Sequence, residues 1–426
     1  MNTKIRLVIM NFLEFAIWGA YLTSMGSYLA GIGMGSNIGL FYAVQGIVSL
    51  FMPALLGIVA DRWIPAQKVL SISQFVAGAF MIAAGYYAST VDTVQFAALF
   101  TLYTISVAFY MPTLALSNSV AYTGLTKAGL DTVKAFPPIR VFGTVGFICA
   151  MLFVDFAGFQ ASSTQFYVSG ILSLVLAIYA LTLPTCPTST NSKSGSLVDA
   201  LGLRAFALFK EKKMAIFFIF SMLLGVSLQI TNGFDNPFIS SFKADPILCN
   251  TFGAQHANAL ISLSQISETL CILLIPFALS RFGIKKVMLI AMFAWVLRFG
   301  LFGAGNPGGG VWMFILSMIV YGVAFDFFNV SGSLFVDKET DPSIRSSAQG
   351  LFMIMTNGIG ATIGTLSAQA IVNRYTYTTE LDGTFYTVGD WSTVWYIFAA
   401  YAFVVAITFA LVFKYKHNPS KIEHKS

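Results

Sequence analysis

Long apolar runs separated by short polar turns dominate this sequence of 426 residues. Hydrophobic residues make up 57% of the chain, and Asp, Glu, Lys and Arg together only 10%, against about 25% in an ordinary soluble domain. So few charges cannot cover the surface of a soluble fold of this size. A transmembrane β-barrel is also excluded, because its strands alternate polar and apolar residues over about 10 positions. We therefore predict an all-α integral membrane protein.

A bilayer core about 30 Å thick requires about 20 apolar residues for each helix that crosses it. The run at the N-terminus is too long for a signal peptide and contains Glu14, so we interpret it as a helix. The sequence predicts twelve transmembrane helices, at residues 6–29, 37–60, 68–88, 93–118, 136–157, 164–184, 214–240, 255–280, 286–303, 311–336, 346–371 and 391–414.

The basic residues predict the orientation in the membrane. With the N-terminus inside, 20 of the 24 Lys and Arg residues fall in cytoplasmic segments. Lys243 and Arg374 fall on the opposite side, and Arg140 and Arg298 fall inside predicted helices. Because Lys and Arg retain loops in the cytoplasm, we expect both termini there. This bias also accounts for the net charge of +6, so no nucleic-acid partner is implied. We interpret Arg298, near the outer end of its span, as a side chain that snorkels to the interface.

The longest break between spans, residues 185–213, predicts the domain organisation. It begins with a polar tract typical of a flexible linker and leaves six spans on each side. We expect one six-helix bundle at 1–184, a cytoplasmic linker, and a second six-helix bundle at 214–426. Two halves of equal helix number predict bundles that move against each other during transport.

The cysteines do not indicate a metal or redox site. Cys149, Cys186, Cys249 and Cys271 are far apart, and the sequence contains no CxxC pair. We interpret all four as packing residues, and we expect neither a metal nor a cofactor.

Polar side chains lie near the centres of three predicted spans. Glu268 is the midpoint of the run 257–279, Asp326 is less than one turn from the centre of 311–336, and Gln229 is next to the centre of 215–240. An ionisable group at that depth costs at least ~2.5 kcal/mol, so it requires a functional reason. Transporters bind their substrates near the same depth.

Helical spacing adds a second polar or aromatic group to each of these positions, since residues three or four apart share a helix face. For the amides, interhelical hydrogen bonding that only holds the bundle together remains an alternative. A carboxyl is harder to explain that way, because an amide would be less costly. The pairs are Gln265 with Glu268, Gln229 with Asn232, and Tyr321 with Phe325.

Arg140 is the predicted counter-charge. Its helix is introduced by Pro137 and Pro138, and the apolar run that follows, 139–154, is only about 24 Å long. The membrane must therefore begin before Arg140, although a charge at the cytoplasmic interface is the alternative. Thr144 and Phe147 follow on the same helix face.

Glu14 lies about 6 Å from the centre of the first span. It is either a second proton site or a partner of a neighbouring helix, and the sequence does not choose between these roles.

The aromatic side chains narrow the class of ligand. Phe147, Tyr321 and Phe325 offer flat faces on which a nucleobase stacks for about 1–3 kcal/mol. Amides and carboxylates pair with base edges and ribose hydroxyls. A sugar site usually adds tryptophan, and none lies near the central depth of these helices. The composition favours a nucleoside only slightly, so a carrier of a sugar or another polyol stays open.

Several long strings resemble the bacterial nucleoside:proton symporter family of the major facilitator superfamily, and the resemblance covers nearly the whole chain. Tyr321-Gly322, Gly143-Thr144 and Gly146-Phe147 also match. Glu14 departs from the family pattern, which has an amide near this position. The strings are FMPALLGIVADRW at 51–63, FPPIR at 136–140, LQITN at 228–232, SQISETL at 264–270 and AFDFFN at 324–329.

The resemblance implies uptake of nucleosides with protons across the bacterial cytoplasmic membrane, by alternating access of the two halves. We expect Glu268 to carry the proton and Arg140 to keep Asp326 ionised, with Glu14 as a further candidate proton site. We expect a monomer. A receptor without flux and a membrane enzyme are the other classes, and no nucleophile motif or phosphate loop supports an enzyme. The implied nucleoside site consists of Arg140, Thr144, Phe147, Gln229, Asn232, Gln265, Glu268, Tyr321, Phe325 and Asp326.

Overall fold

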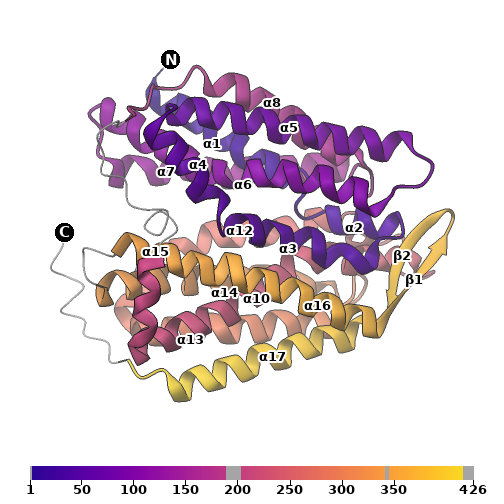
Figure 1. Ribbon diagram of the computed structural model, residues 1–426. Helices are drawn as coiled ribbons and strands as arrows, with labels where there is room; N and C mark the ends of the chain where they lie inside the picture. Colours follow the sequence, from indigo (N-terminus) through magenta and orange to yellow (C-terminus); the bar gives the residue numbers. More distant parts are fainter. Residues whose placement is uncertain (1, 189–202, 341–344, 416–426) are drawn as a thin grey trace. The chain divides into compact units, whose positions relative to one another are not determined.

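The computed structural model describes residues 2–188, 203–340 and 345–415. Contacts between residues divide the chain into two compact units (Figure 1). One is formed by Met1–Leu201 with Glu380–Tyr386, and the other by Gly202–Thr379 with Thr387–Ser426.

The first unit is a bundle of helices in which α1 packs on α7, and α5 packs on α6 and α8. The short 3₁₀ helix η1 (Gly35–Asn37) precedes α3. The helices are α1 (Thr3–Gly19), α2 (Met25–Gly31), α3 (Ile38–Ser49), α4 (Met52–Arg62), α5 (Ala66–Thr90), α6 (Phe96–Lys127), α7 (Thr132–Phe156) and α8 (Thr164–Ala180).

In the second unit α13 packs on α14 and α17, and α12 packs on α14. The short helices η2 (Leu203–Lys210) and η3 (Phe242–Ala244) flank α10, and η4 (Ile354–Gly360) is a π-helix between α15 and α16. The longer elements are α10 (Lys212–Ser241), α11 (Phe252–Gln255), α12 (Ala257–Ile272), α13 (Ile275–Ala304), α14 (Val311–Glu339), α15 (Arg345–Met353), α16 (Ala361–Tyr375), β1 (Thr376–Leu381), β2 (Thr384–Gly389) and α17 (Trp391–Val412).

The helices match the predicted spans, with several informative differences. Within the described residues, nine helical segments are long and apolar enough to cross a membrane. The predicted span 6–29 is broken between α1 and α2, and the span 164–184 contains the shorter helix α8. The span 255–280 is divided between α12 and the first turns of α13.

The segment α13 consists of two helices that meet at Gly283, which lies in the turn predicted between the eighth and ninth spans. Gly283 of α13 has φ 75° and ψ 164°, a backbone conformation that glycine adopts readily because it lacks a Cβ. The helix α7 also begins earlier than predicted, at Thr132, so Pro137 and Pro138 lie inside it rather than in its first turn.

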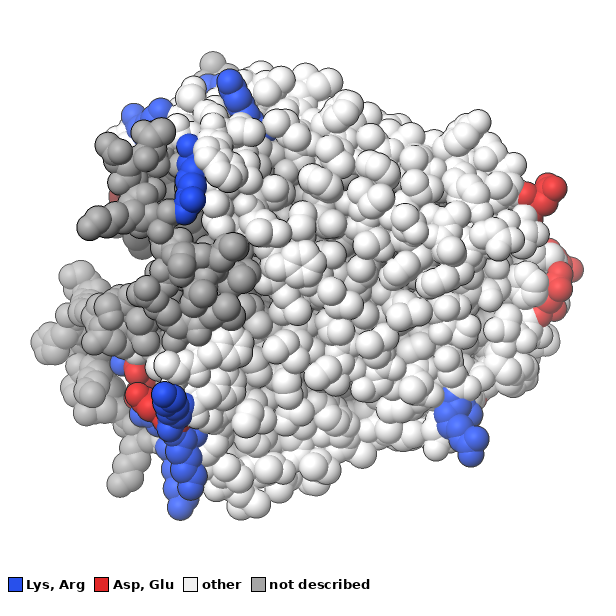
Figure 2. All heavy atoms as spheres, in the orientation of Figure 1, with Lys and Arg blue, Asp and Glu red and all other residues white. Residues whose placement is uncertain are grey.

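Charged side chains gather at the helix ends. On the face drawn in Figure 2, Lys, Arg, Asp and Glu lie near the two ends of the helices, and the flanks between them are uncharged. An uncharged flank is what contact with lipid tails requires, because a charge there is costly.

The polar segment between α16 and α17, rich in Thr and Tyr, is a β-hairpin formed by β1 and β2 rather than an irregular loop. Asp382 and Gly383 at its turn both have positive φ, as a type I′ turn requires. Asp390 then caps α17, since its carboxylate accepts hydrogen bonds from the backbone N–H and the hydroxyl of Thr393. These bonds lower the pKa of Asp390.

The cysteines are all free thiols. Cys186 and Cys271 are buried and Cys249 is half-buried, as expected of packing residues. Cys149 is exposed on α7, so the prediction that it is a packing residue is wrong.

Candidate functional site

The predicted residues of α14 form one continuous surface inside the second unit. The rings of Tyr321 and Phe325 are stacked, with centroids 5.8 Å apart and planes 10° apart. Asp326 follows directly and is 5% exposed. Its Oδ2 atom is buried and has no hydrogen-bond partner among the described residues. A ligand that donates a hydrogen bond would satisfy this oxygen.

The helices α12 and α14 approach each other closely beside the two carboxyls. A Cβ atom on Gly322 would lie 2.5 Å from the carbonyl oxygen of Ser267, so only glycine fits. The hydroxyl of Ser267 donates a hydrogen bond to the carbonyl of Ile319. Because Glu268 follows Ser267, this contact brings it near Asp326, and the two carboxyls act electrostatically on each other.

Replacing Gly322 with alanine tests this close approach. The added Cβ would meet backbone atoms that cannot move independently, so the two helices must separate. We expect Gly322→Ala to lower the free energy of unfolding by about 1–3 kcal/mol. The control is Gly300→Ala in α13, where a Cβ meets nothing within 4 Å. Thermal unfolding in detergent compares them, and equal stability of the two variants would contradict the close contact.

The amides complete the polar face of the second unit. Gln229 and Asn232 are half-buried on α10, with Asn232 Nδ2 3.5 Å from Gln229 Oε1. Gln265 and Glu268 are half-buried, one turn apart on α12. Four polar side chains thus remain partly accessible within an apolar bundle, where full burial without partners would be unfavourable.

In the first unit, α7 carries Arg140, Thr144 and Phe147 in close contact with α1. The Arg140 guanidinium lies 3.8 Å from the ring centroid of Phe15. Phe147 makes an edge contact with Trp18, at 6.4 Å between ring centroids. A Cβ on Gly19 would lie only 2.3 Å from the carbonyl oxygen of Phe147, so glycine permits this packing. Arg140 belongs to the first unit and Asp326 to the second, and their pairing stays a prediction.

Glu14 is fully buried between three helices. Its carboxylate accepts hydrogen bonds from Gln74 Nε2 of α5, at 2.9 Å, and from Thr113 Oγ1 of α6, at 2.5 Å. Tyr110 donates a hydrogen bond to its backbone carbonyl, and Arg140 acts on it electrostatically. Glu14 therefore does pair with neighbouring helices, which was one of the two predicted roles.

A buried ion pair in the second unit was not predicted from the sequence. Arg298 is fully buried, and its Nη2 atom lies 2.6 Å from Asp235 Oδ2 of α10. Its Nη1 atom donates to the carbonyl of Ser317, and the guanidinium lies 4.8 Å from the ring centroid of Tyr321. The prediction that Arg298 snorkels to the interface is therefore wrong. A carboxyl in the span of α10 opposite an arginine in the span of α13 was the signal that could have revealed the pair.

The comparisons with known proteins identify the family to which the chain belongs. The model of the family described as "Nucleoside H+ symporter" matches residues 1–418. Nucleoside permease NupG of Escherichia coli is 50% identical over 420 residues, which cover 98% of this chain and 97% of the permease. Xanthosine permease of Escherichia coli is 46% identical, covering 100% of this chain and 99% of that protein.

The crystal structure of nucleoside transporter NupG superposes with a TM-score of 0.88 at 48% sequence identity, covering 98% of this chain and 100% of that chain. This match confirms the predicted all-helical fold of the major facilitator superfamily. With a family model that spans nearly its whole length, this multi-pass membrane protein belongs to the nucleoside H⁺ symporter family, whose members are transporters and not enzymes.

Proposed function

We propose that this symporter takes up nucleosides together with protons by alternating access of its two six-helix halves, residues 1–184 and 214–426. The observation that carries the proposal is the pair of carboxyls Glu268 and Asp326 beside the stacked rings of Tyr321 and Phe325. Stacked rings accept a flat base, and carboxyls both bind hydroxyls and exchange protons.

The nucleoside contacts side chains from both halves in this proposal. The base stacks on aromatic rings, and the amides and carboxyls form hydrogen bonds with polar groups of the base and ribose. Arg140 provides the positive charge that balances the carboxyls when they are ionised. The proposed site is Arg140, Thr144, Phe147, Gln229, Asn232, Gln265, Glu268, Tyr321, Phe325 and Asp326.

The proton binds to Glu268, while Asp326 and Glu14 are the other candidate proton sites. Glu268 is half-buried, so water can reach it. Glu14 is fully buried and hydrogen-bonded at both carboxylate oxygens, so water reaches it less readily than it reaches Glu268. We also place the protein in the bacterial cytoplasmic membrane, as a monomer. Both termini lie in the cytoplasm in this proposal, because basic residues predominate in the segments assigned to that side.

Uptake in sealed vesicles tests the proposed function. We expect labelled uridine or adenosine to accumulate against its gradient, and a protonophore to abolish the accumulation. Excess unlabelled nucleoside should compete, whereas sugars should not. Competition by a sugar or polyol instead would favour the alternative carrier, and binding without any flux would indicate a receptor. Accumulation that is indifferent to the protonophore would contradict proton coupling.

A further inference from the structure

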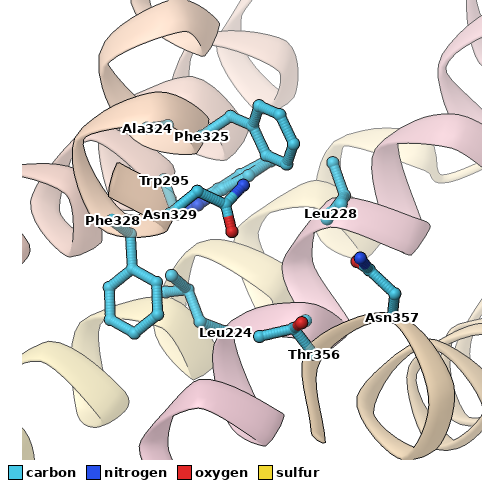
Figure 3. Close-up of a pocket in the computed structure, with 10 residues that line it drawn as sticks. Leu224, Leu228, Trp295, Ala324, Phe325, Phe328, Asn329, Thr356 and Asn357 are labelled. Carbon is cyan, nitrogen blue, oxygen red and sulfur yellow. The ribbon is translucent and has the colours of Figure 1, made fainter. Parts of the chain in front are cut away.

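A pocket in the second unit lies about one helical turn from the proposed carboxyl site and includes polar side chains that have no role there. Figure 3 shows its lining, drawn from α10, α13, α14 and η4. It encloses about 260 Å³ of empty space, including its open mouth. Phe325 belongs both to this pocket and to the proposed site, and Asn329 follows it at i+4 on the same face of α14.

The wall of the pocket is closely packed. A Cβ on Gly225 of α10 would lie 2.1 Å from the carbonyl oxygen of Thr356, and one on Gly360 would lie 2.4 Å from the carbonyl oxygen of Met222. The π-helix η4 presents Thr356 and Asn357 to the pocket from the opposite side. π-helical turns are rare and often occur at functional sites. The pocket therefore has a preformed shape.

A buried hydrogen-bond donor in this pocket has no partner. Trp295 is 1% exposed, and its indole N–H has no acceptor among the described residues. Leaving a buried donor unpaired is unfavourable, so a bound group with an acceptor atom would stabilise it. Asn329 and Asn357 extend toward the pocket in Figure 3, and each amide offers a donor next to an acceptor.

The chemistry of the lining selects one part of a nucleoside. None of the described residues that line the pocket is charged, and Phe325 and Phe328 provide flat apolar surfaces. A neutral planar ring with carbonyl and N–H groups on its edge matches this combination, because asparagine amides pair with base edges and aromatic rings stack on base faces. The pocket is small and open at its mouth, so a ligand can insert the polar edge of one ring rather than a whole nucleoside.

We propose that Trp295, Phe325, Phe328, Asn329 and Asn357 form a base subsite, which binds the nucleobase by its polar edge while the ribose lies toward Glu268 and Asp326. The assignment rests on the proposed nucleoside transport and adds to it the orientation of the substrate. It also makes Asn329, Asn357 and Trp295 specificity-determining residues.

Equilibrium binding of three ligands to the purified full chain tests the subsite: uridine, 3-methyluridine, whose base edge is blocked, and 2′-deoxyuridine, whose ribose is changed. The wild-type protein should bind 3-methyluridine about tenfold more weakly than uridine. Asn329→Leu and Asn357→Leu should each weaken uridine binding about tenfold and remove the discrimination against the methylated base. The preference between ribose and deoxyribose should not change.

The control is Asn373→Leu, which changes an exposed asparagine of α16 outside the pocket lining and should behave like the wild-type protein. Trp295→Phe keeps an aromatic ring but removes the N–H donor and part of the side-chain volume. It should weaken uridine binding several-fold, and it provides a second test if a leucine variant does not fold. Wild-type discrimination in every folded pocket variant would overturn the base subsite alone. Failure of the wild-type protein to bind any nucleoside would instead overturn the proposed function.

Discussion

Glu268→Gln is expected to abolish uphill accumulation of nucleosides while preserving exchange of nucleoside across the membrane. Glutamine keeps the size and the hydrogen-bonding capacity of the side chain, but it cannot bind and release a proton. The variant should therefore still bind substrate and reorient when loaded. It should not respond to the proton gradient.

The expected loss is large. One proton moving through 100 mV supplies about 2.3 kcal/mol, which corresponds to roughly a fifty-fold concentration ratio. In proteoliposomes with an imposed membrane potential, the accumulation ratio of labelled uridine should fall from that range to about one. Counterflow measured without a gradient should stay near the wild-type rate.

The same accumulation assay includes a control variant, and it can identify the proton site if Glu268→Gln still accumulates uridine. Glu380→Gln, at an exposed position of the hairpin, is the control and should accumulate uridine normally. Retained accumulation in Glu268→Gln would move the proton site to Asp326 or Glu14, and Asp326→Asn and Glu14→Gln in the same assay would distinguish them. The half-buried position of Glu268 favours it, because Asp326 and Glu14 are 5% and 0% exposed.

The Arg298–Asp235 ion pair should contribute strongly to stability. Arg298→Met leaves Asp235 buried without its counter-charge, and we expect the free energy of unfolding to fall by about 3–5 kcal/mol. The double variant Arg298→Met with Asp235→Leu removes both charges and should recover most of that loss. Unfolding by SDS in mixed micelles measures the four proteins of this double-mutant cycle.

A second ion pair of the same unit supplies the control. Lys213 and Glu339 also form a salt bridge, but their side chains are 40% and 24% exposed, against 0% and 2% for Arg298 and Asp235. Lys213→Met should therefore cost less than about 1 kcal/mol. If Arg298→Met were no more destabilising than Lys213→Met, the buried pair would have no special structural role.

The sequence alone predicted the membrane fold. Apolar run length sets where helices cross a bilayer, and arithmetic along 257–279 and 311–336 predicts that Glu268 and Asp326 lie near the midplane. Helical spacing also paired Tyr321 with Phe325, which are stacked in the structure. The pair Asp382-Gly383 is a sequence signal for the turn of the hairpin at 376–389.

Only the tertiary structure decided which polar groups pair and where helices break. The Arg298 side chain can reach the membrane–water interface only if it faces lipid. The direction in which this side chain points depends on how α13 is rotated against α10 and α14. That rotation places it against Asp235 and under Tyr321 instead. The close approach at Gly322, the kink at Gly283 and the pocket beside η4 likewise arise from packing between distant segments. Hydropathy measures how deep a residue lies, whereas neighbours in three dimensions determine which way its side chain points.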